Sequence, residues 1–279
     1  MKKLGFIGAG NMAEALARGL LAKKVFSPAE IIASDVEPKR RRRLARLLKV
    51  ETTADNLAVA NQARAIVLAV KPQTIDAVLD EIAVALRPKG RTGRARSETL
   101  FISIAAGVPI SRLEAHLGGN ARVIRVMPNA PAMVGQGMAA LVGGSRATRA
   151  DEAFALKIFR AVGEALVLRD EALLDAVTAL SGSGPAYVYL FVNAMAEAAA
   201  KEGLTVELAL EMALQTVRGA EQTMRQSKLQ PSELIRIVAS PGGTTEAALK
   251  KFAEAGFSDI VGAAIRAAAA RSRELGRSG

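Results

Sequence analysis

The stretch Gly5-Phe6-Ile7-Gly8-Ala9-Gly10-Asn11-Met12-Ala13 decides the fold of this chain of 279 residues. It fits the pattern G-x-G-x-x-G/A, in which Gly8 makes a tight turn and Gly10 lets the backbone approach a pyrophosphate. Ala13, in the last position, allows a helix to pack closely on a strand. The pattern is weak alone, but it predicts a dinucleotide site when it follows a strand and opens a helix.

Both flanks of the pattern supply that context. Lys3–Ile7 is a short apolar segment typical of a strand, and Met12, Leu16 and Leu20 recur at helical spacing. Because the first N–H groups of a helix have no partner within the helix, they are available to phosphate. The cofactor contacts that we expect at this turn are Gly8, Gly10, Asn11 and Met12.

The rest of the first half alternates short apolar runs with helical patterns, which indicates strand–helix–strand units in a parallel sheet. The expected strands are Lys3–Ile7, Glu30–Ser34, Ala65–Val70, Thr99–Ile104, Arg122–Met127, Met138–Val142 and Glu164–Leu168. The expected helices include Glu37–Leu48, Thr74–Leu86 and Asp151–Val162. The predicted fold class is therefore α/β, with an N-terminal Rossmann domain over residues 1–165.

The strand signal then stops, and residues 166–279 are expected to form an all-helical domain. Its expected helices are Asp175–Leu180, Ala186–Ala200, Val206–Gln226, Ser232–Val238, Thr245–Ala255 and Asp259–Leu275. Ala186–Ala200 is apolar on nearly every side, so it must be buried. A helical half of this size has little room to bury such a helix, and we infer that another subunit covers it.

The residues at the end of the second strand, Ser34-Asp35, are expected to determine the preference for NADH or NADPH. Asp35 stands where an acid binds a free ribose 2′-hydroxyl, which favours NADH. Lys39 and Arg40 follow closely and favour the 2′-phosphate of NADPH. Asp35 equally suits a cap of the helix Glu37–Leu48. We predict NADPH as the preferred cofactor, with NADH also accepted.

Two later strands end in sequences that suit a cofactor, Ala69-Val70-Lys71-Pro72 and Ala105-Ala106-Gly107-Val108. Ligands of such sheets lie at the carboxyl ends of the strands. Pro72 fixes the first loop and Lys71 adds positive charge, while the small residues of the second loop let a nicotinamide lie flat against the backbone. Each tetrapeptide taken alone is equally consistent with an ordinary loop.

The helical half contains a second anion site in the stretch Ser240-Pro241-Gly242-Gly243-Thr244-Thr245-Glu246. The two glycines free the backbone, and Thr244 or Thr245 begins a helix whose unpaired N–H groups and dipole favour a carboxylate or phosphate. The alternative is an ordinary threonine N-cap. Another glycine and serine turn, Ser181–Tyr187, suits either close helix packing or a wall of a substrate site.

Composition narrows the classes of function. The chain has no Cys and a single His116, which excludes disulfides, thiolate chemistry and a multi-histidine metal site. The net charge of +11 is concentrated in Lys39–Arg43 with Arg46 and in Arg87–Arg96. Neither run is interleaved with aromatic residues that stack on bases, so we expect solvated faces and no nucleic-acid partner.

The sequence gives no sign of a membrane segment. Ala186–Met195 is too short to span a bilayer, which needs about 20 apolar residues. Asn11, Glu14 and Arg18 interrupt the first apolar run, which therefore does not suit a signal peptide. We expect a cytoplasmic protein.

The motifs together resemble the pyrroline-5-carboxylate reductase family. The matching segments are Gly5–Met12, Ala69–Pro72, Ser103–Val108, Met127–Asn129, Asp175–Thr178 with Leu180–Tyr187, and Ser240–Thr245. They occur in family order over the whole length, and the last two are specific to this family. The resemblance implies reduction of 1-pyrroline-5-carboxylate to L-proline with NAD(P)H, the last step of proline biosynthesis. It also implies a homodimer joined through the helical domain, which in many members assembles further.

The resemblance also assigns roles within the site. Asn56 would touch the cofactor ribose, and the Thr245 hydroxyl would meet the ring nitrogen as the catalytic group. The substrate-binding residues would be Ser240, Gly242, Gly243, Thr244 and Thr245, with the carboxylate on the last three backbone N–H groups. Two features depart from the family. Ala130 stands where many members have Thr, and the basic insert Arg87–Ser97 is longer than expected.

Two alternatives stay open. A β-hydroxyacid or 6-phosphogluconate-type dehydrogenase shares the two-domain plan but needs a catalytic lysine in the helical domain, for which Lys201 is available at an expected helix end. A cofactor-sensing or nucleic-acid-binding protein would use the fold without turnover. For the reductase, no His, Cys or obvious buried acid is placed to protonate the imine, so the iminium binds directly or Thr245 relays a proton from water.

Overall fold

The computed structural model of the chain describes residues 2–86, 99–118 and 121–277. The basic insert Arg87–Ser97 lies outside these residues. By its internal contacts the chain divides into two compact units. We call residues 1–183 with 268–279 the sheet unit, and residues 184–267 the helical unit. The predicted domain division after residue 165 stays a prediction.

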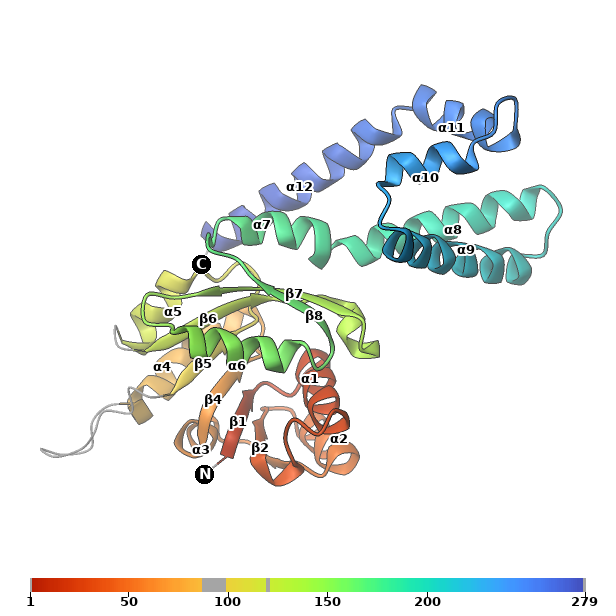
Figure 1. Cartoon of the computed structure of the whole chain (residues 1–279). Helices are drawn as coiled ribbons and strands as arrows, with labels where there is room; N and C mark the ends of the chain where they lie inside the picture. The colour runs from red at the N-terminus through yellow and green to blue at the C-terminus, as the bar shows by residue number, and fades with distance from the viewer. Residues whose placement is uncertain (1, 87–98, 119–120, 278–279) are drawn as a thin grey trace, which may run out of the picture. The chain divides into compact units, whose positions relative to one another are not determined.

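The sheet unit is built on one eight-stranded sheet in the order β3-β2-β1-β4-β5-β6-β7-β8 (Figure 1). The strands are β1 (Lys2–Ile7), β2 (Ile31–Ser34), β3 (Glu51–Thr53), β4 (Ala63–Leu68), β5 (Leu100–Ser103), β6 (Arg122–Met127), β7 (Gly137–Gly143) and β8 (Gly163–Val167). The first six run parallel. The chain builds outward from β1 to β3 and then returns to β4 on the other side of β1. Ligands of open α/β sheets bind at the carboxyl edge beside such a switch point.

Helices cover both faces of this sheet, as the continuous apolar strands predict. They are α1 (Asn11–Ala22), α2 (Pro38–Leu48), α3 (Asn56–Gln62), α4 (Ile75–Leu86), α5 (Ile110–Leu117), α6 (Arg149–Phe159) and α7 (Leu173–Val177). Short turns of 3-10 helix lie at η1 (Pro28–Glu30), η2 (Pro72–Thr74) and η3 (Ala130–Val134), and a π-helical turn, η4 (Thr178–Gly182), follows α7.

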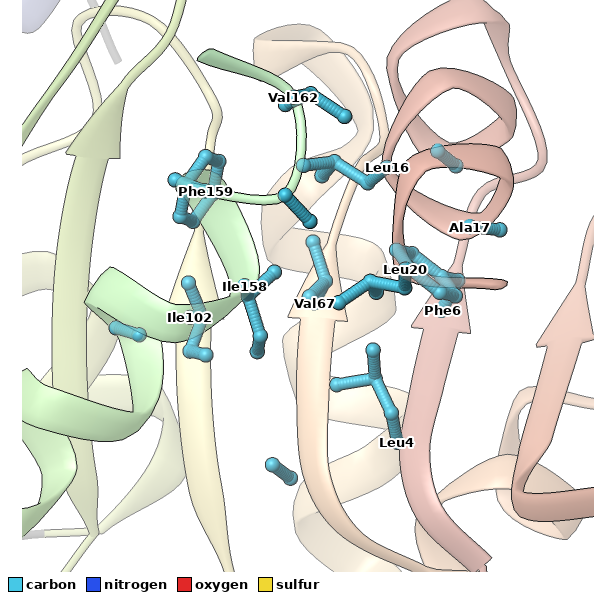
Figure 2. Close-up of a cluster of buried hydrophobic side chains, with 14 of the residues drawn as sticks. Leu4, Phe6, Leu16, Ala17, Leu20, Val67, Ile102, Ile158, Phe159 and Val162 are labelled. Atoms are coloured by element: carbon cyan, nitrogen blue, oxygen red, sulfur yellow. The ribbon is translucent and has the colours of Figure 1, made fainter. Parts of the chain in front are cut away.

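Two core clusters hold these layers together. Figure 2 shows the first, in which Phe6 of β1 and Val67 of β4 meet Leu20 of α1 and Ile158 of α6. The second lies on the opposite face, where Ile66 of β4 joins side chains of α3, α4 and α5. Val67 and Ile66 are neighbours on one strand and enter different clusters, because successive side chains of a strand point to opposite faces. Both clusters lie within the sheet unit, so this unit has a complete core.

The last two strands depart from the expected parallel sheet. β7 runs antiparallel to β6 and pairs Val126 with Leu141, while β8 runs parallel to β7. The physical reason is the short connection, since residues 128–136 hold only the turn η3. A parallel crossover needs about a dozen residues or more, usually with a helix.

Apart from the short 3-10 turns, three elements of the sheet unit were not predicted. β3 has only the three polar residues Glu51–Thr53, so it carries no apolar run. α3 has seven residues and α5 has eight, which is too short for a clear helical period. The expected strands and helices are otherwise present, with ends that differ by a few residues.

The helical unit contains α8 (Gly184–Lys201), α9 (Val206–Ser227), α10 (Pro231–Val238), α11 (Thr244–Glu254) and the first part of α12 (Phe257–Arg277). Its buried apolar side chains are Val192, Ala196, Ala209 and Ala213. Leu190 of α8 is 70% exposed and Ile237 of α10 is 68% exposed. The unit therefore leaves most of its apolar side chains uncovered, including those of α8 that we expected another subunit to bury. No helix in the described part of the chain is long and apolar enough to cross a membrane.

Glu14 ties α1 to α2. Its carboxylate accepts hydrogen bonds from Arg43 Nε at 2.6 Å, from Arg43 Nη2 at 3.1 Å and from Arg18 Nη2 at 2.5 Å. The Arg43 guanidinium holds the pKa of Glu14 below its ordinary value. The Glu14 side chain is 13% exposed and that of Arg43 is 59% exposed, so solvent screens part of the attraction.

We predict that Glu14→Gln lowers the free energy of unfolding by about 1 kcal/mol at neutral pH. Because the folded pKa is the lower one, this stabilisation is complete above the unfolded value of 4.5 and is lost as the pH falls through the folded pKa. Urea unfolding of wild type and variant between neutral pH and pH of about 2 measures it. The exposed Glu164 supplies the control variant, Glu164→Gln. A Glu14→Gln difference that does not shrink in acid would contradict the assignment.

Candidate functional site

The backbone turn after β1 touches the backbone that follows β4. Gly8 has a φ of +97°, and a Cβ added there would lie 2.6 Å from the Ala69 carbonyl oxygen. The Gly8 N–H donates to Ser34 O at 2.8 Å, and the Ala69 N–H donates to Ile7 O at 2.8 Å. Only glycine suits both the left-handed backbone and the close approach. The ends of β1, β2 and β4 are thereby held together at the switch point.

α1 presents open donors at this turn. Gly10 is the N-cap of the helix, and a Cβ added there would meet no atom within 4 Å. Within the described residues, nothing accepts a hydrogen bond from the N–H groups of Asn11 and Met12. These donors and the positive end of the helix dipole favour an anion. The geometry therefore fits the pyrophosphate of a dinucleotide.

The Asp35 carboxylate, just beyond β2, is bound to backbone. Its Oδ2 accepts from the Ala9 N–H and its Oδ1 from the Glu37 N–H, both at 2.8 Å. Its side chain is only 5% exposed. The N-cap of α2 is Glu37, so Asp35 is not the cap itself. Asp35 instead supports the glycine turn, and both of its oxygens already have a donor.

Contacts separate the basic residues that open α2. The Arg41 guanidinium donates to the carbonyl oxygens of Asp35 at 2.6 Å and Val36 at 3.1 Å. Arg43 is bound to Glu14 of α1. Both of these arginines therefore make structural contacts, Arg41 with the backbone before α2 and Arg43 with α1.

Arg40 and Lys39 lie on the same first turn of α2. Both side chains are exposed, and Arg40 Nη1 is 3.6 Å from Asp35 Oδ2. In dinucleotide folds an acid at the position of Asp35 marks the ribose 2′-hydroxyl, and a nearby arginine accommodates a 2′-phosphate. Of Lys39 and Arg40, Arg40 is therefore the one whose guanidinium lies beside the Asp35 carboxylate, a distinction that the sequence did not make.

Ser34 and Asn56 meet at the same edge. Ser34 is the last residue of β2, and its Oγ donates to Asn56 Oδ1 at 2.7 Å. Asn56 opens α3, and its Nδ2 donates to Glu81 Oε2 of α4 at 2.7 Å. The Asn56 amide is thus fixed at both ends. Glu81 has no motif around it, and only the tertiary contact identifies it.

The loops after β4 and β5 are neighbours, because these strands pair in register. In the first, Lys71 is exposed and is the N-cap of the turn η2, which begins at Pro72. In the second, Ala105 is buried and Gly107 has a φ of +78°. The structure therefore brings the predicted cofactor residues of the sheet unit to one edge.

The predicted anion pocket of the helical unit opens α11. Gly243 is the N-cap, with no side-chain cap, so the threonines do not cap this helix. The Gly242 N–H donates to Glu246 Oε2 at 2.8 Å, and the Gly243 N–H donates to Ser240 O at 3.0 Å. Among the described residues, the N–H groups of Thr244 and Thr245 donate to nothing. The two threonine N–H groups are therefore open donors of this pocket.

Thr245 also borders an apolar groove of about 450 Å³ within the helical unit. The other lining residues come from α9, α10 and α11, and Thr223 is the further polar one among them. The hydrogen bond from the Gly242 N–H to the Glu246 carboxylate was not predicted. A glutamate at the third position of a helix commonly accepts a hydrogen bond from the backbone at the start of that helix.

Metal ligands do not gather in the described part of the chain, where no group of three His, Cys, Asp or Glu side chains could hold an ion. The single His116 lies in α5, with Nδ1 2.6 Å from Asp80 Oδ1 and Nε2 3.5 Å from Asp76 Oδ1. These contacts tie α5 to α4.

We predict that Gly10→Ala weakens NADPH binding at least about tenfold and leaves the melting temperature nearly unchanged. The added methyl has free space in the protein, but it occupies the path by which the pyrophosphate reaches the backbone. Calorimetric titration and thermal unfolding measure the two effects. Gly8→Ala, which forces a Cβ onto Ala69, should instead destabilise the fold by about 2 kcal/mol or more. Unaltered NADPH affinity in Gly10→Ala would contradict this site.

Two family models match the chain. Residues 171–275 match pyrroline-5-carboxylate reductase dimerisation. Residues 3–107 match a family described as NADP oxidoreductase coenzyme F420-dependent. The first covers the region whose apolar side chains are uncovered, and the second covers the glycine turn and the loops at the sheet edge.

Relatives match from end to end. The chain is 44% identical to pyrroline-5-carboxylate reductase of Pseudomonas aeruginosa, over 98% of this chain and 96% of the relative. It is 40% identical to that of Methanosarcina acetivorans, over 99% of this chain and 98% of the relative.

Solved structures agree. Pyrroline-5-carboxylate reductase of Coxiella burnetii matches with a TM-score of 0.90 and 35% identity, over 98% of both chains. Plasmodium falciparum pyrroline carboxylate reductase with NADP bound matches with a TM-score of 0.86 and 31% identity, over 99% of this chain and 98% of the other. Sequence and fold thus agree over the whole length, and the chain belongs to the pyrroline-5-carboxylate reductase family.

Proposed function

We propose that this protein reduces 1-pyrroline-5-carboxylate to L-proline with NADPH, the last step of proline biosynthesis, and that it also accepts NADH. The observation that carries the proposal is the start of α11, where the open N–H groups of Thr244 and Thr245 adjoin the Thr245 hydroxyl. These groups match a carboxylate and the nitrogen of a cyclic imine. Relatives that bear the name of this reductase support it.

The edge of the sheet holds the cofactor in this proposal. Gly10, Asn11 and Met12 bind the pyrophosphate, because the turn is open and its donors are free. Arg40 binds the 2′-phosphate, and the small residues of Ala105–Gly107 form the surface under the nicotinamide. When bound, the cofactor supplies the hydride. The protein contributes position and charge.

The start of α11 holds the substrate. The carboxylate accepts hydrogen bonds from the Thr244 and Thr245 N–H groups, with the helix dipole adding attraction. Gly242 and Gly243 let the backbone approach the carboxylate, and Ser240 fixes the turn by accepting from the Gly243 N–H. The imine carbon is thereby oriented for attack, so catalysis rests mainly on positioning and electrostatics.

The Thr245 hydroxyl is the group that meets the ring nitrogen. It holds the proton of a bound iminium or passes one from water, since a protonated imine accepts hydride more readily. His116 is bound to Asp80 of α4, so it takes no part in this step.

We further propose a homodimer joined through the helical unit. The exposed apolar side chains of α8, α9 and α10 support it, as does the match of residues 171–275 to a dimerisation family. A higher assembly and a cytoplasmic location stay predictions.

The alternatives have less support. A β-hydroxyacid-type dehydrogenase needs a catalytic lysine, and Lys201 is an exposed residue at the very end of α8. A cofactor sensor would need no free donors at α11. Neither alternative is favoured by full-length relatives that bear the reductase name.

Cofactor oxidation tests the reaction and the role of Arg40. Purified protein is mixed with 1-pyrroline-5-carboxylate, and oxidation of NADPH and NADH is followed in parallel. We expect turnover with both and a higher kcat/KM for NADPH. Arg40→Ala should lower kcat/KM for NADPH about tenfold, the scale of one charge-assisted contact, and leave NADH nearly unchanged. Lys39→Ala is the matched control.

Equal losses with both cofactors in Arg40→Ala would remove Arg40 from the phosphate site. No oxidation by folded protein that binds NADPH would overturn the reductase assignment, and oxidation of a hydroxyacid would then favour the dehydrogenase.

We predict that Thr245→Val lowers kcat about a hundredfold, because a valine keeps the shape of the side chain and the backbone N–H but lacks the hydroxyl. NADPH affinity should stay as in the wild type. Thr245→Ser, which keeps the hydroxyl, should recover most of the activity. Steady-state kinetics and NADPH titration of the three proteins measure this, and unchanged kcat in Thr245→Val would show that the hydroxyl has no catalytic role.

A further inference from the structure

The last turns of α12 belong to the sheet unit, although the helix begins in the helical unit. Ala269, Ser272 and Gly276 recur at spacings of three and four, so they share one face of the helix. Ser272 is 4% exposed, and its Oγ donates to Asp175 Oδ1 of α7 at 2.6 Å. Figure 1 shows this end of α12 beside α7. One face of this helix end therefore packs against α7 within the sheet unit.

The same face touches the loop after β5. A Cβ added at Gly107 would lie 3.2 Å from Leu275 Cβ and 3.3 Å from Gly276 N. A Cβ added at Gly276 would lie 2.9 Å from the Gly107 carbonyl oxygen. The two backbones are therefore in direct contact, with a glycine on each side.

This loop has short side chains and long hydrogen bonds. Ala105, Ala106 and Gly107 carry no side chain longer than a methyl group. The Val108 N–H donates to Ala105 O at 3.4 Å, and the Ala105 N–H to Ser103 Oγ at 3.3 Å. Both hydrogen bonds are long for their type. The backbone contact with α12 therefore contributes, together with the buried Ala105 and Val108, to where the backbone of the loop lies.

α7 fixes the end of α12 that contacts this loop. Leu174 is 1% exposed and lies in the same core cluster as Ala105 and Val108. Asp175 follows it directly and receives the Ser272 hydroxyl. The loop, α7 and the end of α12 thus form one packed group within the sheet unit.

We propose that the end of α12 is a positioning element for the nicotinamide. Gly276 sets how closely the helix approaches Gly107, and the Ser272–Asp175 hydrogen bond sets the register of the helix. Gly276 and Asp175 act through the loop Ala105–Gly107, so they are positioning residues. The inference rests on the proposed cofactor role of this loop.

Gly276→Ala tests the contact, since its methyl group must displace the Gly107 carbonyl. The two ligands are NADPH and 2′,5′-ADP, a fragment with the adenosine and 2′-phosphate but no nicotinamide. We expect the Kd of NADPH to rise about tenfold and that of 2′,5′-ADP to stay unchanged, because misplacement affects only the nicotinamide end. Gly262→Ala makes the same change in the same helix, where the added Cβ would meet the tip of the flexible Arg266 side chain. This control should bind both ligands as the wild type does.

A second pair of variants tests the register. Asp175→Ala removes the acceptor of the Ser272 hydroxyl and should give the same split between the two ligands. Asp175→Asn keeps an oxygen acceptor and should restore NADPH binding. In turnover, Asp175→Ala should raise the KM for NADPH and lower kcat, with the KM for the imine unchanged.

Equal weakening of both ligands would show a general loosening of the fold and would overturn the proposal, as would unchanged NADPH binding in Gly276→Ala and Asp175→Ala. Binding is measured without turnover. A wild type that binds NADPH but does not reduce 1-pyrroline-5-carboxylate would therefore contradict the proposed reaction, while the ligand split would still decide the positioning role.

Discussion

The backbone contact between Gly8 and Ala69 is the constraint on which the cofactor edge depends. It joins the ends of β1 and β4 where the chain changes direction across the sheet. The turn that it creates leaves the Ala9 N–H to the Asp35 carboxylate, which in turn receives the Glu37 N–H before α2. Three strand ends are thereby set by backbone atoms and one carboxylate. An edge built in this way depends on glycine at position 8, where the backbone conformation and the contact with Ala69 leave no room for a side chain.

The fold could be predicted where a long periodic pattern of apolar residues coincides with a turn residue such as glycine or proline. The glycine turn between β1 and α1 is such a place, and so is the run of helices from α8 to α12. β3 escaped prediction because three polar residues at the sheet edge need no apolar run. The direction of β7 escaped because apolar patterns do not reveal strand direction. The nine residues between β6 and β7 permit a hairpin connection and are too few for a helical crossover.

The candidate site was predictable in place but not in its contacts. The sequence located Ser240–Thr245 as a source of donors, yet the structure shows two of those N–H groups already engaged, at Gly242 by Glu246 and at Gly243 by Ser240. Similarly, the sequence does not distinguish Lys39 from Arg40, whereas the structure places the Arg40 guanidinium 3.6 Å from the Asp35 carboxylate. The bond between Asn56 and Glu81 joins residues 25 positions apart. Such contacts depend on side-chain direction and packing, which no local pattern contains.

The unfinished core of the helical unit links the amount of this protein to its stability. The sheet unit has two core clusters of its own, whereas α8, α9 and α10 leave apolar side chains exposed that the proposed dimer would cover. Because association follows mass action, dilution of the proposed dimer would lower the stability of the helical unit more than that of the sheet unit. At low expression, a cell would hold chains with a formed cofactor edge and an unsettled substrate pocket. Catalytic capacity would then rise more steeply than the number of chains made.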